Sequence, residues 1–247
     1  MNLVVYSAHY GTADPLNPEV FGGFDTARKV LFTDRPGIRL PGVEVIVDPT
    51  DGLDPARASR RAKLMPHRYF PDMEHSLWLD NKSRLKRDPQ EVLSVLRAQS
   101  DADFLAFPHF RRDCVYQEGQ AVWENGLDDY RLVRSRMDAY RAEGMPAHAG
   151  LIEGHFLFRR HNAPDLIRFG ERWFEHVLRY SRRDQISFPY LVWKLGLRYE
   201  FITALDWRET VEFTVFDRKA RKTDFPRKNA AYQQLRGIWH RLRRRLR

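Results

Sequence analysis

Six short apolar runs, each bounded by polar or turn-forming residues, constrain the fold of this chain more than any other feature. Apolar residues stand at successive positions in them, which is typical of strands that are covered on both faces. Such strands occur in a parallel sheet with helices between the strands. The runs are residues 2–8 (NLVVYSA), 30–34 (VLFTD), 43–48 (VEVIVD), 75–80 (HSLWLD), 103–110 (DFLAFPHF) and 149–162 (AGLIEGHFLFRRHN).

Helical patterns fill the intervals between these runs. The clearest begins at Asp88, an N-cap acid followed by Pro89 and then Glu91, and it predicts a helix over 89–99. Asp184 or Ser187 is expected to cap a later helix that carries Tyr190 to Lys194. The other predicted helices are residues 56–65, 128–145 and 164–180. The pattern therefore predicts one α/β domain over residues 1–225, with a mixed, mostly parallel central sheet and helices on both faces.

Composition and cysteine content narrow the class of protein. A hydrophobic fraction of 43% and an aromatic fraction of 13% are those of a globular domain. The single cysteine, Cys114, excludes an internal disulfide and fits a reducing compartment. No apolar run reaches the roughly 18 residues that cross a bilayer, and the N-terminus lacks the basic region of a signal peptide. We therefore expect a soluble, cytoplasmic chain.

A net charge of +9 and a pI near 9.8 favour an anionic partner. Residues 226–247 predict a basic amphipathic helix, which can lie on an anionic membrane surface at the inner membrane face or dock on the domain. Nucleic acid is not expected, because no recognised binding module accompanies the charge. At helical spacing the tail carries apolar Tyr232, Leu235, Ile238, Trp239, Leu242 and Leu246, opposite Arg236, His240, Arg243, Arg244 and Arg247.

Polar residues at the ends of the apolar runs are the first candidates for a ligand site, because open α/β sheets bind ligands beyond the carboxyl ends of their strands. They are Ser7 to Gly11, Asp34, Asp48 and Asp80. Aspartate also follows strands simply because it forms turns, so a structural role stays open for each. Gly-rich phosphate loops of either familiar spacing are absent from the sequence, as are HxxxH and CxxC metal patterns.

Five ordered motifs resemble the glycosyltransferase-like domain of the plant turgor-regulation and mucilage-related proteins, which also has bacterial members. They are FTDRP, SRRAKLMPHRYFPDMEHSLWLDNK, HFRRDCVYQEGQAV, EGHFLFRRH and SRRDQISFP, and the resemblance covers residues 2 to about 205. More distantly, the order of the motifs is similar to that of GT-A glycosyltransferases. The resemblance implies a GT-A-like fold and transfer of a sugar from a nucleotide diphosphate sugar to a glycan or lipid-linked acceptor.

The WLDNK motif stands where the similar transferases keep an Asp-x-Asp pair that holds a divalent cation against the donor diphosphate. Asp80 fits the first position, but Lys82 occupies the second, and an ammonium group cannot ligate a metal. Two interpretations stay open. Asp80 holds Mg²⁺ or Mn²⁺ with help from elsewhere, or Lys82 itself neutralises the diphosphate.

The strand-end positions and the resemblance together give the expected roles of the candidate residues. Catalysis is expected from Asp184, Gln185 and Glu153; donor binding from Ser7, Ala8, Asp34, Arg60, Lys63, Asp80 and Lys82; and an acceptor or sugar site from His109, Arg111, Glu118 and His155. Structural alternatives exist for several. Glu153 could form a salt bridge to Arg159 or Arg183, and the residues around His109 could form a buried ion-pair network without chemistry.

Two other classes of function stay open. A relative in the resembling family has been described as a ceramide-cleaving hydrolase, but a zinc amidase needs clustered ligands, and the histidines here are scattered along the sequence. The domain could also bind a sugar nucleotide without turning it over. Both are carried as alternatives to glycosyl transfer.

Overall fold

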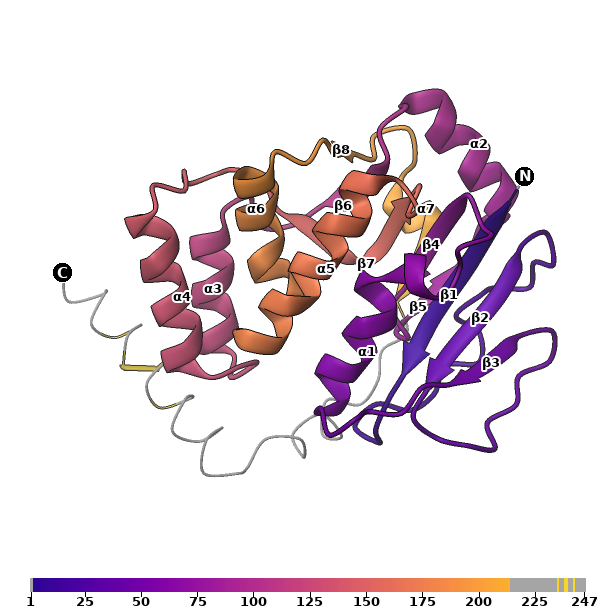
Figure 1. Ribbon diagram of the computed structural model, residues 1–247, viewed down its shortest axis with the longest axis horizontal. Coiled ribbons are helices and arrows are strands. Elements are labelled where there is room, and N and C mark those ends of the chain that lie inside the picture. Colours follow the sequence, from indigo (N-terminus) through magenta and orange to yellow (C-terminus); the bar gives the residue numbers. More distant parts are fainter. Residues whose placement is uncertain (1, 214–234, 236–237, 240–241, 243–247) are drawn as a thin grey trace.

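A seven-stranded sheet, in the order β3-β2-β1-β4-β7-β6-β8, forms the centre of the molecule (Figure 1). The computed structural model describes residues 2–213, 235, 238–239 and 242. A separate antiparallel pair, β5 and β9, lies beside the large sheet. The strands are β1 (Leu3–His9), β2 (Arg28–Thr33), β3 (Glu44–Val47), β4 (His75–Leu79), β5 (Ser83–Leu85), β6 (Phe104–Pro108), β7 (Ile152–Arg159), β8 (Glu200–Phe201) and β9 (Val211–Phe213).

Strand direction decides which residues meet. β3, β2, β1 and β4 pair in parallel, and β7 pairs antiparallel with both β4 and β6. The carboxyl ends of β1, β2, β4 and β6 therefore lie at one edge of the sheet, together with the amino end of β7. Ile152 and Glu153 at the start of β7 consequently share an edge with Asp80 and His109, which follow β4 and β6.

Helices cover both faces of the sheet. On one face α1, α5, α6, α3 and α4 pack as successive neighbours, and α2 packs on the other (Figure 1). Alternation along β1 explains the two layers, because Val4 and Tyr6 belong to the first core and Leu3 and Val5 to the second. The helices are α1 (Pro55–Leu64), α2 (Pro89–Gln99), α3 (Val115–Glu124), α4 (Tyr130–Ala142), α5 (Pro164–Arg179), α6 (Asp184–Leu195) and α7 (Trp207–Thr210), with a 3-10 turn at Pro66–Arg68.

Most predicted elements are present with bounds shifted by a few residues, and α2 begins and ends where the Asp88 cap predicts. α3 was not predicted. The capping of α6 was also predicted wrongly. The helix begins at Asp184 with Arg183 as its N-cap, and no side chain caps it, because the Asp184 carboxylate is turned to cations instead. Gly196 ends α6 in the left-handed conformation.

The predicted basic helix over 226–247 lies largely outside the described residues. Its described members Leu235, Ile238, Trp239 and Leu242 are helical and exposed. Across the part of the chain that the structure describes, no helix combines the length and apolar character needed to span a membrane.

Candidate functional site

A cleft of about 280 Å³ opens at the shared edge of the sheet, where β1 and β4 end and α1 begins. This volume is near the lower end of the range ordinary for ligand pockets. Four cations line the cleft, together with Asp80 and the aromatic side chains of Tyr10 and Trp78. The cations are Arg60, Lys82, Arg182 and Arg183.

Beneath the cleft lies a buried pair of opposite charges. Lys63 Nζ is 2.5 Å from Asp184 Oδ2 and 3.5 Å from Asp80 Oδ1, and the Lys63 side chain is only 1% exposed. Arg60, which does line the cleft, places its Nε 3.3 Å from Asp184 Oδ1. Asp80 is further fixed by Trp78 Nε1, which donates to Oδ1 at 2.9 Å. We call Arg60, Lys63, Asp80 and Asp184 the charge cluster.

The end of α1 is held so that Lys63 can reach this position. The Lys63 carbonyl oxygen accepts hydrogen bonds from the Tyr6 hydroxyl at 3.1 Å and from Arg159 Nη1 at 2.8 Å. Arg159 also bonds the Tyr6 hydroxyl. The last turn of a helix leaves carbonyl groups without partners inside the helix, so β1 and β7 satisfy one of them here.

Burial and charge set the protonation of the cluster. Burial alone disfavours a carboxylate, but the charges of Lys63 and Arg60 outweigh it and lower the pKa of Asp184 to about 2. Burial likewise opposes ionisation of Asp80, and Lys63, Lys82 and Arg60 together hold its pKa well below the ordinary value. Burial lowers the pKa of Lys63, while Asp184 and Asp80 act against that effect. Both carboxylates are therefore ionised at neutral pH.

Gly154 explains the Glu-Gly pair inside an otherwise apolar strand. A Cβ atom at this position would lie 3.1 Å from Lys63 Nζ and 3.7 Å from Asp184 Oδ2, closer to the lysine than side-chain carbons ordinarily come. A glycine therefore lets β7 pass directly over the charge cluster. Because side chains alternate along a strand, Glu153 and His155 point to the opposite face.

Glu153 lies between two imidazoles. Its Oε1 is 3.5 Å from His109 Nε2, and its Oε2 is 3.4 Å from His155 Nδ1. Burial raises the pKa of Glu153, but His155 and His109 outweigh that effect and the pKa is lowered. Glu118 on α3 completes the group, with Oε2 2.7 Å from Arg112 Nε and 3.7 Å from His109 Nε2. The predicted salt bridge from Glu153 to Arg159 or Arg183 is therefore wrong, because the carboxylate contacts His109 and His155 instead.

The other predicted donor and acceptor residues differ in burial, and only some of them line the cleft. Ala8 and Lys82 line the cleft, whereas Ser7 is fully buried within β1. Asp34 accepts hydrogen bonds from the Gly11 backbone N–H at 3.0 and 3.1 Å, so it supports the loop after β1. Arg111 is exposed.

Asp184 and Gln185 do not line the cleft. They are 3% and 8% exposed and lie behind Arg60 and Arg183. Gln185 Nε2 donates to the Ile152 carbonyl at 3.0 Å, and its Oε1 accepts from Arg183 Nη2 at 3.3 Å. Gln185 therefore ties the start of α6 to the start of β7.

Sequence reasoning missed Arg182 and Arg183 as cleft residues, although they stand inside a motif it singled out. Asp128, before α4, is what places them: its Oδ2 accepts from Ser181 Oγ at 2.6 Å and from the Arg182 backbone N–H at 2.9 Å. Asp128 is only 5% exposed. The position of Arg182 and Arg183 depends on this contact between distant segments, and no local sequence pattern reveals such a contact.

The charge cluster does not fit a divalent cation held by the protein. The groups closest to Asp80 are the Lys63 ammonium and the Trp78 N–H, both hydrogen-bond donors. Among residues 2–213 and the four described tail residues, no three His, Cys, Asp or Glu side chains gather closely enough to hold a metal.

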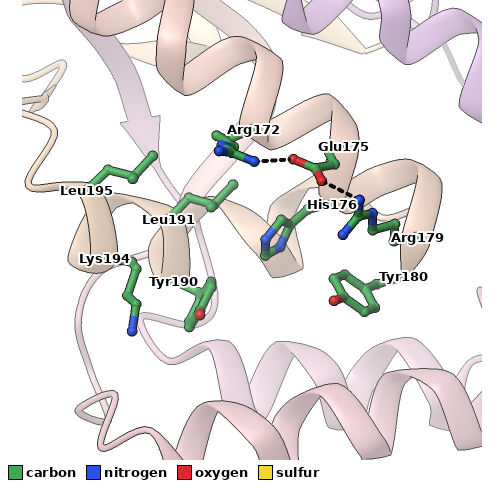
Figure 2. Close-up of a pocket in the computed structure, with 9 residues that line it drawn as sticks. All are labelled: Arg172, Glu175, His176, Arg179, Tyr180, Tyr190, Leu191, Lys194 and Leu195. Carbon is green, nitrogen blue, oxygen red and sulfur yellow. Dashed lines mark hydrogen bonds and ion pairs between the residues drawn. The ribbon is translucent and has the colours of Figure 1, made fainter.

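A second cavity, of about 240 Å³, lies between α5 and α6 (Figure 2). Its one carboxylate, Glu175, is paired with Arg172 and Arg179 at 2.8 Å each (Figure 2). Burial, reinforced by the charge of Arg136, lowers the pKa of His176 to about 4, so its ring is neutral at pH 7. None of the predicted site residues is among the nine that line this cavity.

A basic cleft at the carboxyl edge of a mostly parallel sheet is typical of α/β proteins that bind phosphorylated ligands. The family model described as "TOD1/MUCI70, glycosyltransferase-like domain" matches residues 44–223, and the chain belongs to that family. A curated relative from Arabidopsis thaliana, "Probable hexosyltransferase MUCI70", is 32% identical over 152 residues, which are 58% of this chain and 26% of the relative. The chain thus spans about a quarter of that relative's length. The predicted family and the predicted α/β fold class are both confirmed.

Three solved glycosyltransferase structures share remote likeness with the chain. The bifunctional enzyme WbbM has a TM-score of 0.46 at 13% identity, covering 81% of this chain and 38% of that one. Mouse xyloside xylosyltransferase 1 has a TM-score of 0.48 at 9% identity, with coverage of 82% and 85%. A glycosyltransferase involved in the glycosylation of the major capsid of PBCV-1 has a TM-score of 0.49 at 10% identity, with coverage of 91% and 100%.

Proposed function

We propose that this domain transfers a hexosyl group from a nucleoside diphosphate sugar to a glycan or lipid-linked acceptor. The observation that carries the proposal is the cleft lined by Arg60, Lys82 and the Arg182–Arg183 pair beside the ionised carboxylate of Asp80, with Asp14 as the second carboxylate of the lining. Four cations against two carboxylates leave an excess of positive charge that suits a dianionic diphosphate, and arginine in particular matches phosphate geometry. Family membership supports the same class of reaction.

In this proposal the diphosphate is neutralised by side-chain cations, in place of a metal fixed by two carboxylates. Leaving-group charge develops on the β-phosphate as the glycosidic bond breaks, and preorganised cations stabilise that charge in the transition state. Lys82 occupies the place of the second metal ligand and therefore supplies the charge directly. The nucleoside would lie against Ala8 and Tyr10, at the end of β1.

Asp80 is the one carboxylate of the charge cluster that lines the cleft, beside the cluster cation Arg60. Its side chain is 25% exposed, so a sugar hydroxyl can reach it. Asp184 acts through its neighbours: by pairing with Lys63 and Arg60 it fixes both cations beneath the donor. Asp184 is therefore a positioning residue in this mechanism.

The proposal is tested with a panel of nucleoside diphosphates and nucleotide sugars, each scored by thermal shift and by donor hydrolysis. A ligand that binds the native state raises its melting temperature. We expect one donor to do so and to be hydrolysed, with hydrolysis lost in Asp80→Asn, which can still accept the Trp78 hydrogen bond. Asp165→Asn, an exposed change on α5, is the control.

The same panel separates the alternatives. A thermal shift with no hydrolysis and no transfer would identify a binding protein. If no nucleotide or nucleotide sugar raises the melting temperature, glycosyl transfer is overturned. An amide hydrolase has no support from the described residues, which lack the metal-ligand cluster that such chemistry needs.

We further propose that the tail holds the enzyme at the cytoplasmic face of an anionic membrane. Residues 241–247 contain five arginines, and each cation near an anionic surface contributes about 1 kcal/mol. Replacing these five arginines by glutamine should release the protein from phosphatidylserine vesicles at low salt, without changing donor hydrolysis. If wild-type protein ignores such vesicles, the membrane proposal fails.

A further inference from the structure

An aromatic group stands next to Glu153, on the side of the sheet edge away from the charge cluster. The rings of Phe110 and Trp207 stack with centroids 4.2 Å apart. Phe213 extends the group, 5.6 Å from Trp207 and 4.5 Å from the His155 ring. We call Phe110, Trp207 and Phe213 the aromatic platform.

The aromatic platform leaves a large apolar side chain at the surface. Phe110 lies two residues after the end of β6 and is 42% exposed, although burial of a phenylalanine side chain is favourable. Two other segments, α7 and β9, bring Trp207 and Phe213 to meet it. Trp207 is half-buried and packs against the core on the α2 side of the sheet, so Phe110 is the exposed member of the stacked pair. An aromatic ring supported in this way and left exposed at the edge of the candidate site is a feature that a structural role alone does not require.

The platform is continuous with both halves of the candidate site. Lys82, which lines the cleft, places its Nζ 5.4 Å from the centre of the Phe213 ring. On the other side, Phe110 lies 5.8 Å from the His155 ring, and its backbone N–H is 3.4 Å from Glu153 Oε1. A ligand on the platform therefore lies beside the cleft and against the Glu153 carboxylate, which is 3.5 Å from His109 Nε2 and 3.4 Å from His155 Nδ1.

The geometry points to a saccharide-binding subsite in which the acceptor sugar ring stacks on Phe110, which is backed by the stacked ring of Trp207, and donates a hydroxyl hydrogen bond to Glu153. The inference rests on the proposed function, because it names the second substrate of that reaction. One face of a pyranose presents C–H groups, which pack on an aromatic ring, while its hydroxyls need hydrogen-bond acceptors at the rim. The platform with Glu153 offers both in one place.

The subsite is tested by binding, without relying on turnover. Immobilised cello-, xylo-, manno- and galacto-oligosaccharides, offered both free-ended and as decyl glycosides, distinguish a glycan acceptor from a lipid-linked one. Wild-type protein is expected to be retained by at least one, and Phe110→Ala and Trp207→Ala should each weaken that binding about tenfold. Trp193→Ala, at a 37% exposed tryptophan on α6, is the matched control and should bind as wild type.

Trp207→Phe is the control for misfolding of Trp207→Ala. It keeps an aromatic ring at the position and should retain most of the binding. Donor hydrolysis without acceptor is measured on every variant and should be unchanged in Trp193→Ala. Absence of donor hydrolysis in the wild type would count against the proposed function alone. The subsite itself is overturned if no oligosaccharide retains the wild type, or if Phe110→Ala and Trp207→Ala bind as tightly as Trp193→Ala.

Discussion

Lys63 Nζ lies 2.5 Å from Asp184 Oδ2, in a place where neither side chain is more than 4% exposed. The pair joins the last turn of α1 to the first residue of α6, two helices far apart in sequence. Removing one partner of a buried pair leaves the other charge uncompensated, which costs far more than the pair itself contributes. The stability of the site and its chemistry are therefore coupled through this contact.

Replacing Lys63 by methionine should destabilise the protein strongly, because Asp184 and Asp80 lose their shared cation. We expect the free energy of unfolding to fall by about 3 kcal/mol, measured by urea denaturation. The matched control is Lys194→Met, whose exposed pair with Glu143 should contribute less than about 1 kcal/mol. Equal effects of the two changes would contradict a buried pair at Lys63.

The low pKa of Asp184 makes part of the stability depend on pH. Because the folded-state pKa is about 2 and the ordinary value is 3.8, the unfolded chain takes up the proton first as the pH falls. The contribution is thus fully present above about pH 4 and is lost toward pH 2. The difference in unfolding free energy between wild type and Asp184→Asn should shrink by about 1 kcal/mol between pH 6 and pH 3. A constant difference would argue against the shift.

Gly154→Ala should disturb the site more than the fold. The added methyl group would meet Lys63 Nζ at 3.1 Å, so the ammonium must move away from Asp184 or Asp80. We expect donor hydrolysis to fall at least about tenfold, which corresponds to 1.4 kcal/mol in the barrier. Gly23→Ala, where a Cβ atom meets nothing within 4 Å, is the control. Wild-type hydrolysis in Gly154→Ala would show that Lys63 can shift without consequence.

Lys82 decides whether the proposed chemistry needs a metal. Wild-type donor hydrolysis is expected to resist EDTA, because Lys82 supplies the charge. Lys82→Asp restores a second oxygen ligand beside Asp80 and should make hydrolysis depend on added Mn²⁺. Lys82→Met loses the charge without gaining a ligand, and should be slow with or without Mn²⁺. Loss of wild-type activity in EDTA and its recovery with Mn²⁺ would reverse this assignment.

Gln185→Ala is expected to lower kcat about tenfold with little change in donor affinity. Its amide fixes the Ile152 carbonyl at the start of β7, next to Glu153, so its loss misplaces groups that matter in the transition state. Gln99→Ala is the control, because Gln99 Nε2 makes a comparable 2.8 Å bond to the Phe201 carbonyl at the far edge of the sheet. If donor affinity alone falls, Gln185 is a binding residue.

Local sequence determined most of the secondary structure. The continuous apolar runs predicted strands buried on both faces, and the Asp88-Pro89 start predicted α2 to the residue. These signals succeed because they depend on neighbours within one turn or one strand. α3 escaped prediction because its start at Cys114 has no side-chain cap.

Motifs placed the candidate site, and the sequence by itself named Asp80, Lys63 and Arg60 as parts of it. Only the tertiary structure decided how deeply each of these side chains is buried and which partners it contacts. Nothing local distinguishes the cleft residue Asp80 from Asp34, which bonds the Gly11 backbone, since both are aspartates after a strand. Likewise, the buried position of Lys63 and the need for Gly154 arise because β7, which pairs antiparallel with β4, passes the last turn of α1 at Gly154. Those contacts join residues far apart in the chain, so they contribute free energy only after the sheet and α1 have packed together.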